Sequence, residues 1–155
     1  MSKTTLEKVR DEAKQLLIAE IYNYSTQGFE MSEYVFTGFP STNTAGYPVF
    51  GVYTRTGVAS GFGVGSNRRL STDDLNIVVI TKNNDTYKDE DGETIKSEDV
   101  HLRLRDEVVG LLNYEDLIVD DDFINLVFVR DNTQNLGDKL QTTYTFEVRN
   151  RIGKV

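Results

Sequence analysis

The chain has 155 residues, 17 basic and 25 acidic, and a formal net charge of −8 at pH 7. This length fits one domain with a single core, and the excess of acids disfavours binding to a DNA backbone or an anionic membrane over most of the surface. The absence of cysteine and the single histidine, His101, argue against disulfides, thiolate metal sites and histidine clusters.

An amphipathic helix is predicted near the start of the chain. Thr4 and Glu7 have the spacing of a capping box, in which each side chain binds a free backbone amide of the first turn. The apolar positions that follow recur at three- and four-residue spacing and are Leu6, Val9, Ala13, Leu16, Leu17, Ile21 and Tyr24. We expect the helix to end between Ser25 and Gly28, where glycine can take a left-handed conformation.

Two strands are predicted in the next part of the chain. Residues 47–54 are rich in β-branched and aromatic residues, with Pro48 restricted to the first positions of a strand or to an edge. Residues 75–81 are apolar at both odd and even positions, which predicts a central strand that is covered on both faces. Before them, residues 34–36 could form a short strand, and residues 38–43 favour a turn.

A glycine-rich segment, residues 57–69, separates these two strands. It is too long for a tight hairpin turn and has no sustained apolar face. We therefore predict a long hairpin arm that is mobile in the free protein and becomes ordered against a partner.

Residues 83–96 are rich in acidic residues and asparagine, show no periodicity and are predicted to form an exposed loop. Asp89, Asp91, Gly92 and Glu98 match part of a calcium-loop pattern, but Tyr87 stands where that pattern needs an acid. We therefore favour a solvated acidic loop over a calcium site. The run of acids at residues 120–122 is interpreted as a charged turn, because consecutive extended residues point in opposite directions.

A second helix is predicted from Ser97 to Leu112, with acids in its first turn. Its main apolar stripe consists of Val100, Leu104, Val108, Leu111 and Leu112. Leu102 and Val109 fall on another side, and we predict that they lie in a subunit interface together with Phe62 and Val64 of the arm. His101 is predicted to be an ordinary surface or boundary histidine.

The last third is predicted to be a hairpin. Residues 123–129 form one strand, residues 135–138 a turn, and residues 140–149 a strand with alternating apolar and polar positions. The predicted fold is a single α+β domain over residues 1–155, a two-layer sandwich. It has a mainly antiparallel sheet of four to five strands, two helices on one face and the long arm. Because a helix lies between residues 80 and 123, one pair of strands could be parallel.

No catalytic, cofactor-binding or metal-binding residue is predicted. Residues 61–65 resemble a phosphate-binding loop only in their glycine content, because neither a Lys-Ser/Thr pair nor a helix follows. No nucleophile motif accompanies His101. We find neither the apolar region of a signal peptide nor a membrane-spanning run, and therefore expect a cytosolic product.

The order of these elements resembles that of the tail terminator proteins of long-tailed bacteriophages and their head-tail joining relatives. The resemblance lies in the helix at 5–24, the strand at 47–53, the arm before residues 75–81, the helix at 97–112 and the closing strand at 138–148. It implies a structural virion protein of the tail or neck, assembled in the host cytoplasm, which forms a homohexameric ring that caps the tail tube and ends its growth.

The implied partners are further copies of the chain, the tail tube protein and the head completion or connector protein. DNA would pass through the lumen without specific binding, and a negative charge suits such a conduit because it repels phosphate.

Two alternatives remain open. The chain could be another neck or tail tube protein, or a small ligand-binding α+β domain. In the second case, the aromatic residues that could line an apolar pocket are Tyr47, Tyr53, Phe123, Phe128 and Tyr144.

Overall fold

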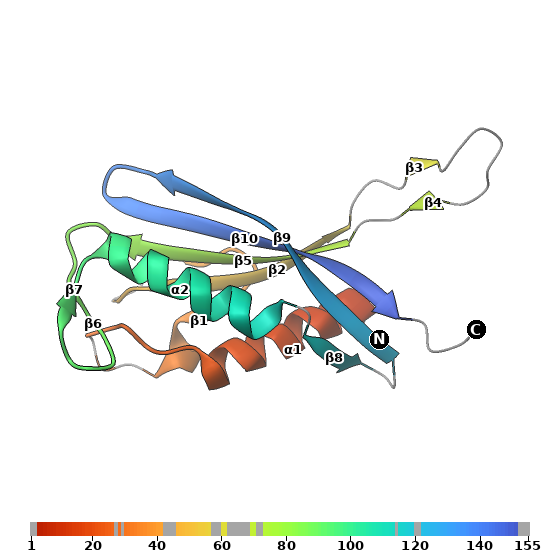
Figure 1. Cartoon of the computed structure of the whole chain (residues 1–155), viewed down its shortest axis with the longest axis horizontal. Coiled ribbons are helices and arrows are strands. Elements are labelled where there is room, and N and C mark those ends of the chain that lie inside the picture. Colours follow the sequence, from red (N-terminus) through yellow and green to blue (C-terminus); the bar gives the residue numbers. More distant parts are fainter. Residues whose placement is uncertain are drawn as a thin grey trace.

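The computed structural model describes residues 3–26, 28, 30–41, 46–56, 60–61, 69–70, 73–113, 115–119 and 122–151. Helices α1 (Thr5–Glu20) and α2 (Ser97–Leu112) cover one face of a six-stranded sheet (Figure 1). In order of pairing, the strands are β1 (Val35–Thr37), β2 (Val49–Thr56), β5 (Asp73–Lys82), β10 (Lys139–Arg151), β9 (Asp122–Asn135) and β8 (Asp116–Val119). Helix α1 contacts both β1 and β8, the two edge strands, so the sheet curls around the helices.

The described residues also contain three smaller elements. A single 3₁₀ turn, η1 (Met31–Glu33), precedes β1. Strands β3 (Ser60–Gly61) and β4 (Arg69–Leu70) pair with each other, as do β6 (Tyr87–Lys88) and β7 (Thr94–Ile95). Neither described helix is long and apolar enough to cross a membrane.

The prediction of an α+β fold with both helices on one face is confirmed, but the predicted sheet of four to five strands is wrong. The sheet is mixed and has six strands, and β1 runs parallel to β2. The helical connection does not create a parallel pair, because β10 lies between β5 and β9. Strand β8 was missed because its four residues are too few to show a period.

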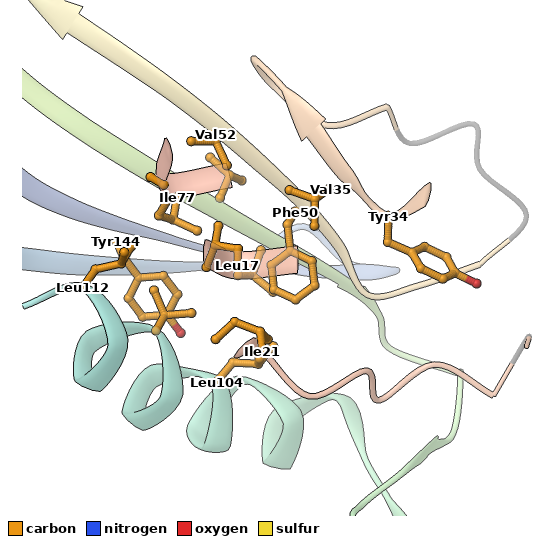
Figure 2. Close-up of a cluster of buried hydrophobic side chains, with 14 of the residues drawn as sticks. Leu17, Ile21, Tyr34, Val35, Phe50, Val52, Ile77, Leu104, Leu112 and Tyr144 are labelled. Carbon is orange, nitrogen blue, oxygen red and sulfur yellow. The ribbon is translucent and has the colours of Figure 1, made fainter. Parts of the chain in front are cut away.

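Strand β5 is central, as its sequence predicts. It pairs with β2 on one side and β10 on the other, and residues 75–81 are all buried. Ile77 faces the helices (Figure 2). On the opposite face of the sheet, the segment containing Gly38 and Pro40 lies against Gly51 of β2. The helices cover one face of the middle strands and this segment covers part of the other, which explains why residues on both faces are apolar.

The core lies between the two helices and the sheet, where side chains from both layers meet (Figure 2). The residues drawn there include Leu17 of α1, Leu104 and Leu112 of α2, Phe50 and Val52 of β2, Ile77 of β5 and Tyr144 of β10. Full burial of each such side chain contributes about 1.5–3 kcal/mol relative to exposure. This shared core holds α2 against β5, β9 and β10 and so fixes the position of the site described below.

Helix α1 begins as predicted and ends earlier than predicted. The amide of Glu7 donates to the Thr4 hydroxyl at 3.2 Å, and the amide of Thr4 donates to the Glu7 carboxylate at 3.1 Å. The helix stops at Glu20. The extended backbone beyond it lets the Tyr24 hydroxyl donate to Glu107 of α2 at 2.7 Å. The apolar residues keep helical spacing as far as Tyr24, but this tertiary contact favours an extended backbone after Glu20.

The β9–β10 hairpin turns after Asn135, as predicted, with Gly137 at a φ of +91°. Strand β9 is longer than the predicted strand at 123–129 because its polar residues 130–135 also pair with β10. Polar residues give no apolar alternation, so this extension was missed. The Asn83 side chain holds the turn in place by donating to the Gly137 carbonyl at 2.8 Å.

Candidate interaction surfaces

A groove runs between the first half of α2 and the β9–β10 hairpin, and we call it the α2 groove. It consists of two adjoining hollows of about 490 and 200 Å³ that share Glu98, Thr133 and Leu140. The larger hollow is also lined by Asn83, Lys96, Ser97 and Asn135. The smaller one is also lined by His101, Leu102, Arg105, Asp131, Thr142 and Tyr144.

The floor of the α2 groove is a chain of hydroxyl groups around His101, and this chain is buried except at Thr133. The Nε2 atom of His101 lies 2.7 Å from the Thr81 hydroxyl, and its Nδ1 atom lies 2.8 Å from the Thr142 hydroxyl. The Thr81 hydroxyl also contacts that of Ser97, and the Thr142 hydroxyl lies 2.9 Å from that of Thr133. The polar groups of the floor therefore satisfy one another.

This network corrects the prediction for His101. His101 is not a surface or boundary residue, because only 6% of it is exposed. Burial lowers its pKa from 6.5 to about 4, so the imidazole is neutral at pH 7. Helix α2 begins at Ser97, as predicted. The Ser97 hydroxyl contacts the Thr81 hydroxyl, and the amide of Lys96 donates to the Asp99 carboxylate at 3.4 Å.

The walls of the groove combine the Arg105–Asp131 ion pair, the apolar side chains of Leu102 and Leu140, and two further charged side chains, Glu98 and Lys96. Arg105 donates from Nε to Asp131 at 2.6 Å, and its guanidinium lies 5.8 Å from the centre of the Phe128 ring. Leu102 is 62% exposed. Glu98 is exposed and has no ion-pair partner among the described residues. The groove thus offers an apolar contact and, outside its ion pair, one acidic and one basic side chain, Glu98 and Lys96.

The predicted interface residues fall in different environments. Leu102 lies in the α2 groove, whereas Val109 is half-buried and packs against the core. Phe62 and Val64 lie outside the described residues, as does the tip of the arm on which the prediction of mobility depends. The subunit interface therefore remains a prediction for all four residues. Of the two that the structure describes, Leu102 is more exposed than Val109.

Exposed apolar side chains also occur far from the groove. Ile118 of β8 and Phe123 of β9 are directly opposed in the sheet and are 65% and 50% exposed. Phe39, which follows β1, is 59% exposed. Sequence reasoning missed these residues, because a strand that lies at an edge cannot be distinguished by its composition from one that is covered.

The predicted ligand-pocket aromatics are not brought together. Tyr144 faces the helices (Figure 2). The Phe128 ring lies under Arg105 of α2 and 5.5 Å from the ring of Phe146. Tyr53 lies on the opposite face of β2 from the buried Val52, and Phe123 is exposed to solvent. These residues therefore do not line one shared pocket.

The loop at 83–96 is more ordered than the predicted exposed acidic loop. It contains the β6–β7 hairpin, and Tyr87, Asp89 and Ile95 are buried. The Asp89 carboxylate accepts the amides of Glu93 at 2.8 Å and Asp91 at 3.0 Å, and Arg103 of α2 donates to it at 3.2 Å. The Glu93 amide, with Arg103, holds the pKa of Asp89 below its usual range. Asp89 is thus a structural residue that fastens this loop to α2.

Millimolar calcium should leave the melting temperature of the protein unchanged. The Asp89 oxygens already bind amides and a guanidinium, and the described residues contain no cluster of three acidic or histidine side chains that could hold a metal. Thermal melts with calcium and with chelator test this. Asp89→Ala, the matched variant, should melt lower than wild type in both solutions. A rise of several degrees with calcium in wild type alone would instead establish a metal site.

Comparisons with known proteins give a match in fold and none in sequence. No model of a known protein family matches the sequence, and no curated protein matches it. The fold is similar to that of a solved chain described as "Virion of native gene transfer agent (GTA) particle", with a TM-score of 0.58 and 15% identity. The match covers 96% of this chain and 98% of that chain. The two chains therefore share one fold from end to end.

Proposed function

We propose that this chain is a structural protein of a phage-like virion, and more specifically a tail terminator. In this role it forms a ring on the end of the tail tube, stops its growth and provides the docking surface for the head connector. The observation that carries the proposal is the similarity in fold to a virion chain over nearly the whole length of both proteins. The order of elements in the sequence points independently to the same class.

The distribution of exposed apolar residues supports ring formation. A closed ring of identical subunits needs two different patches on each subunit, and each patch binds the other type on a neighbour. Leu102 lies in the α2 groove, whereas Ile118 and Phe123 lie on the opposite side of the sheet. Exposed apolar side chains on separate surfaces are typical of protein contacts.

The chemistry of the groove also favours a structural role over catalysis. Both ring nitrogens of His101 are bound by threonine hydroxyls, and burial keeps the ring neutral. A general base needs a free nitrogen within reach of a substrate proton. The overall charge of −8 suits a ring through which DNA slides without binding.

Two measurements test this function. Light scattering and negative-stain images of the purified protein, alone and with tail tube protein, should give rings of six 17.6 kDa chains that cap tubes and limit their length. Rings that join the head connector without limiting the tubes would indicate a head-stopper protein, and co-polymerisation would indicate a tube protein. A protein that stays monomeric and leaves tube growth unchanged would overturn the proposal.

Leu102→Ser should weaken assembly while leaving the subunit stable. Because the side chain is mostly exposed, its loss should change the free energy of unfolding by no more than about 0.5 kcal/mol. Assembly should need a higher protein concentration, which light scattering measures. Leu136→Ser is the matched control, since Leu136 is exposed at the hairpin turn outside the groove lining. Equal assembly of both variants and wild type would place the interface elsewhere.

A further inference from the structure

The outer edge of β9 is open along the second half of the strand. Strand β8 pairs only with residues 122–125 of β9, and the amide of Leu126 donates to the carbonyl of Glu115. Beyond Val129, which is passed over in the register with β10, residues 130–135 pair with β10 alone among the described residues. We call this segment the β9 edge. It belongs to the β9–β10 hairpin, whose turn lies at one end of the long axis of the molecule (Figure 1).

Three residues of the β9 edge direct their backbone groups away from the sheet. At the hairpin turn, the amide of Leu136 donates to the carbonyl of Lys139 at 2.8 Å, so the backbone groups of these two residues face each other. Because these groups alternate in direction along a strand, those of Asp131, Thr133 and Asn135 point to the open side. Outside the ladder with β10, no backbone hydrogen bond involves these three among the described residues.

The β9 edge lacks most features that protect an open strand from pairing. It contains no proline or lysine, and residues 132–135 are all exposed. Charged residues occur only at its first two positions, and Asp131 is already paired with Arg105 at 2.6 Å. A row of unpaired N–H and C=O groups of this kind binds another extended strand. The partner of the β9 edge is therefore recognised by its extended polypeptide backbone.

We propose that the β9 edge pairs antiparallel with the same edge of a second copy, with Thr133 of one chain directly opposite Thr133 of the other. In this register Asp131 lies opposite Asn135, so all three outward-facing residues of each copy exchange hydrogen bonds with the other copy. A shift by two residues in either direction would leave one of the three outside the overlap. The centred register therefore makes the most hydrogen bonds.

The side chains also match in this register. On the side of the helices, the Nδ2 group of Asn135 can donate to the Asp131 carboxylate, and the two Thr133 side chains lie next to each other. Cross-strand threonine pairs stabilise antiparallel sheets. On the other side, the amide of Asn132 meets that of Gln134, and each can both donate and accept. No like charges are directly opposed, so the β9 edge complements itself.

This contact differs in kind from those that close a ring. A ring of identical subunits uses two different patches on each subunit, whereas a two-fold contact uses one patch twice. Each copy has the β9 edge once, so the pairing stops at two copies and joins a subunit to one outside its own ring. The inference thus goes beyond the proposed function and does not depend on it. Pairing also closes an edge that would otherwise bind other strands.

Disulfide trapping tests the register, because the chain contains no cysteine of its own. Full-length Asn132→Cys and Gln134→Cys variants are mixed and oxidised. Their Cα atoms should lie about 4.5 Å apart across the pair, which suits a disulfide. The mixed disulfide should therefore form about tenfold faster than the disulfide within either variant alone. Ile118→Cys with Gln134→Cys is the matched control, since Ile118 is exposed on the open edge of β8. Equal rates in all mixtures would overturn the proposal.

Thr133→Pro tests the backbone hydrogen bonds of the pair. Proline removes the outward N–H group but no bond of the ladder with β10, and edge strands tolerate it. The control is Thr133→Val, which keeps the N–H group and equally lacks the hydroxyl that contacts Thr142. Sedimentation equilibrium should give a dissociation constant for the pair about tenfold higher for proline than for valine. Equal constants for two folded variants would contradict the contact. If the proline variant does not fold, the trapping experiment decides.

Amide hydrogen exchange separates this pair from other partners and from the proposed function. The Thr133 amide of wild type should exchange more slowly as the protein concentration rises, because pairing buries it. Protection that appears only after tail tube or connector protein is added would assign the β9 edge to that partner and overturn self-pairing. Rings without trapped pairs would remove this contact and leave the proposed function standing. Trapped pairs without rings would support the contact and count against the terminator.

Discussion

Gly51→Ala should lower the free energy of unfolding by about 3 kcal/mol, the upper part of the range for overpacked cores. A Cβ atom at this position of β2 would lie 2.4 Å from Cδ of Pro40 and 2.5 Å from the carbonyl oxygen of Gly38. Gly38 is held in place, because its amide donates to the Val52 carbonyl at 2.8 Å. For a domain of this size, we expect the melting temperature to fall by roughly 10 °C.

Gly110→Ala is the matched control for this substitution. Gly110 lies on the exposed side of α2, and an added Cβ would meet nothing within 4 Å. Alanine favours a helix over glycine by about 0.8–1.0 kcal/mol, so this variant should be more stable than wild type. Denaturant unfolding measures both changes. Equal stability of Gly51→Ala and wild type would show that the segment over β2 moves aside freely.

Acid should destabilise the protein through His101. Its pKa is about 4 in the folded protein, against 6.5 for the ordinary side chain, because burial disfavours the imidazolium. Between these values the unfolded chain binds a proton that the folded chain does not, so stability falls as the pH drops from 6.5 to 4. In total, the free energy of unfolding falls by about 3 kcal/mol through this residue. The fall ends below pH 4, where His101 is protonated in both the folded and the unfolded state.

The comparison with His101→Gln isolates this contribution. Carboxylates also titrate in the same range, and burial raises the pKa of Glu107, which acts in the opposite direction. Because both proteins contain these carboxylates, their effects cancel in the difference between the two unfolding free energies. Wild type should lose about 3 kcal/mol relative to the variant between pH 7 and pH 4. A difference that does not vary with pH would mean that His101 titrates normally when folded.

The parts of the fold that depend on local patterns could be predicted from the sequence. The capping box at Thr4 and Glu7 and the doubly covered strand at 75–81 depend on spacing and composition, and both are present. The short edge strands depend on pairing. Residues 34–36 were predicted only as a possible strand, and β8 was missed. Strand β1 has three residues and β8 has four, and each becomes a strand only because a longer neighbour offers a free edge.

In the candidate site, too, features set by local sequence could be predicted, whereas features set by contacts between distant residues could not. Leu102 falls outside the apolar stripe of its helix, and this is a local fact that the sequence displays. The environment of His101 is set by Thr81 and Thr142, which lie 20 and 41 residues away in the chain. The sequence around these two threonines does not indicate that a helix will place the His101 imidazole against their hydroxyl groups. Asp89 is a similar case, since its partner Arg103 belongs to a different element.

The place of β10 in the sheet determines when the sheet and the α2 groove are completed during synthesis. Strand β10 lies between β5 and β9, yet it follows every other strand in the chain, and Leu140 and Thr142 belong to the α2 groove. During synthesis on the ribosome, the apolar β5 has one open edge until residues 139–151 have emerged. Such an edge is prone to pairing with other chains, and late long-range pairing is slow. The same delay means that a nascent chain lacks Leu140 and Thr142, and therefore the hairpin side of the α2 groove, until β10 has emerged.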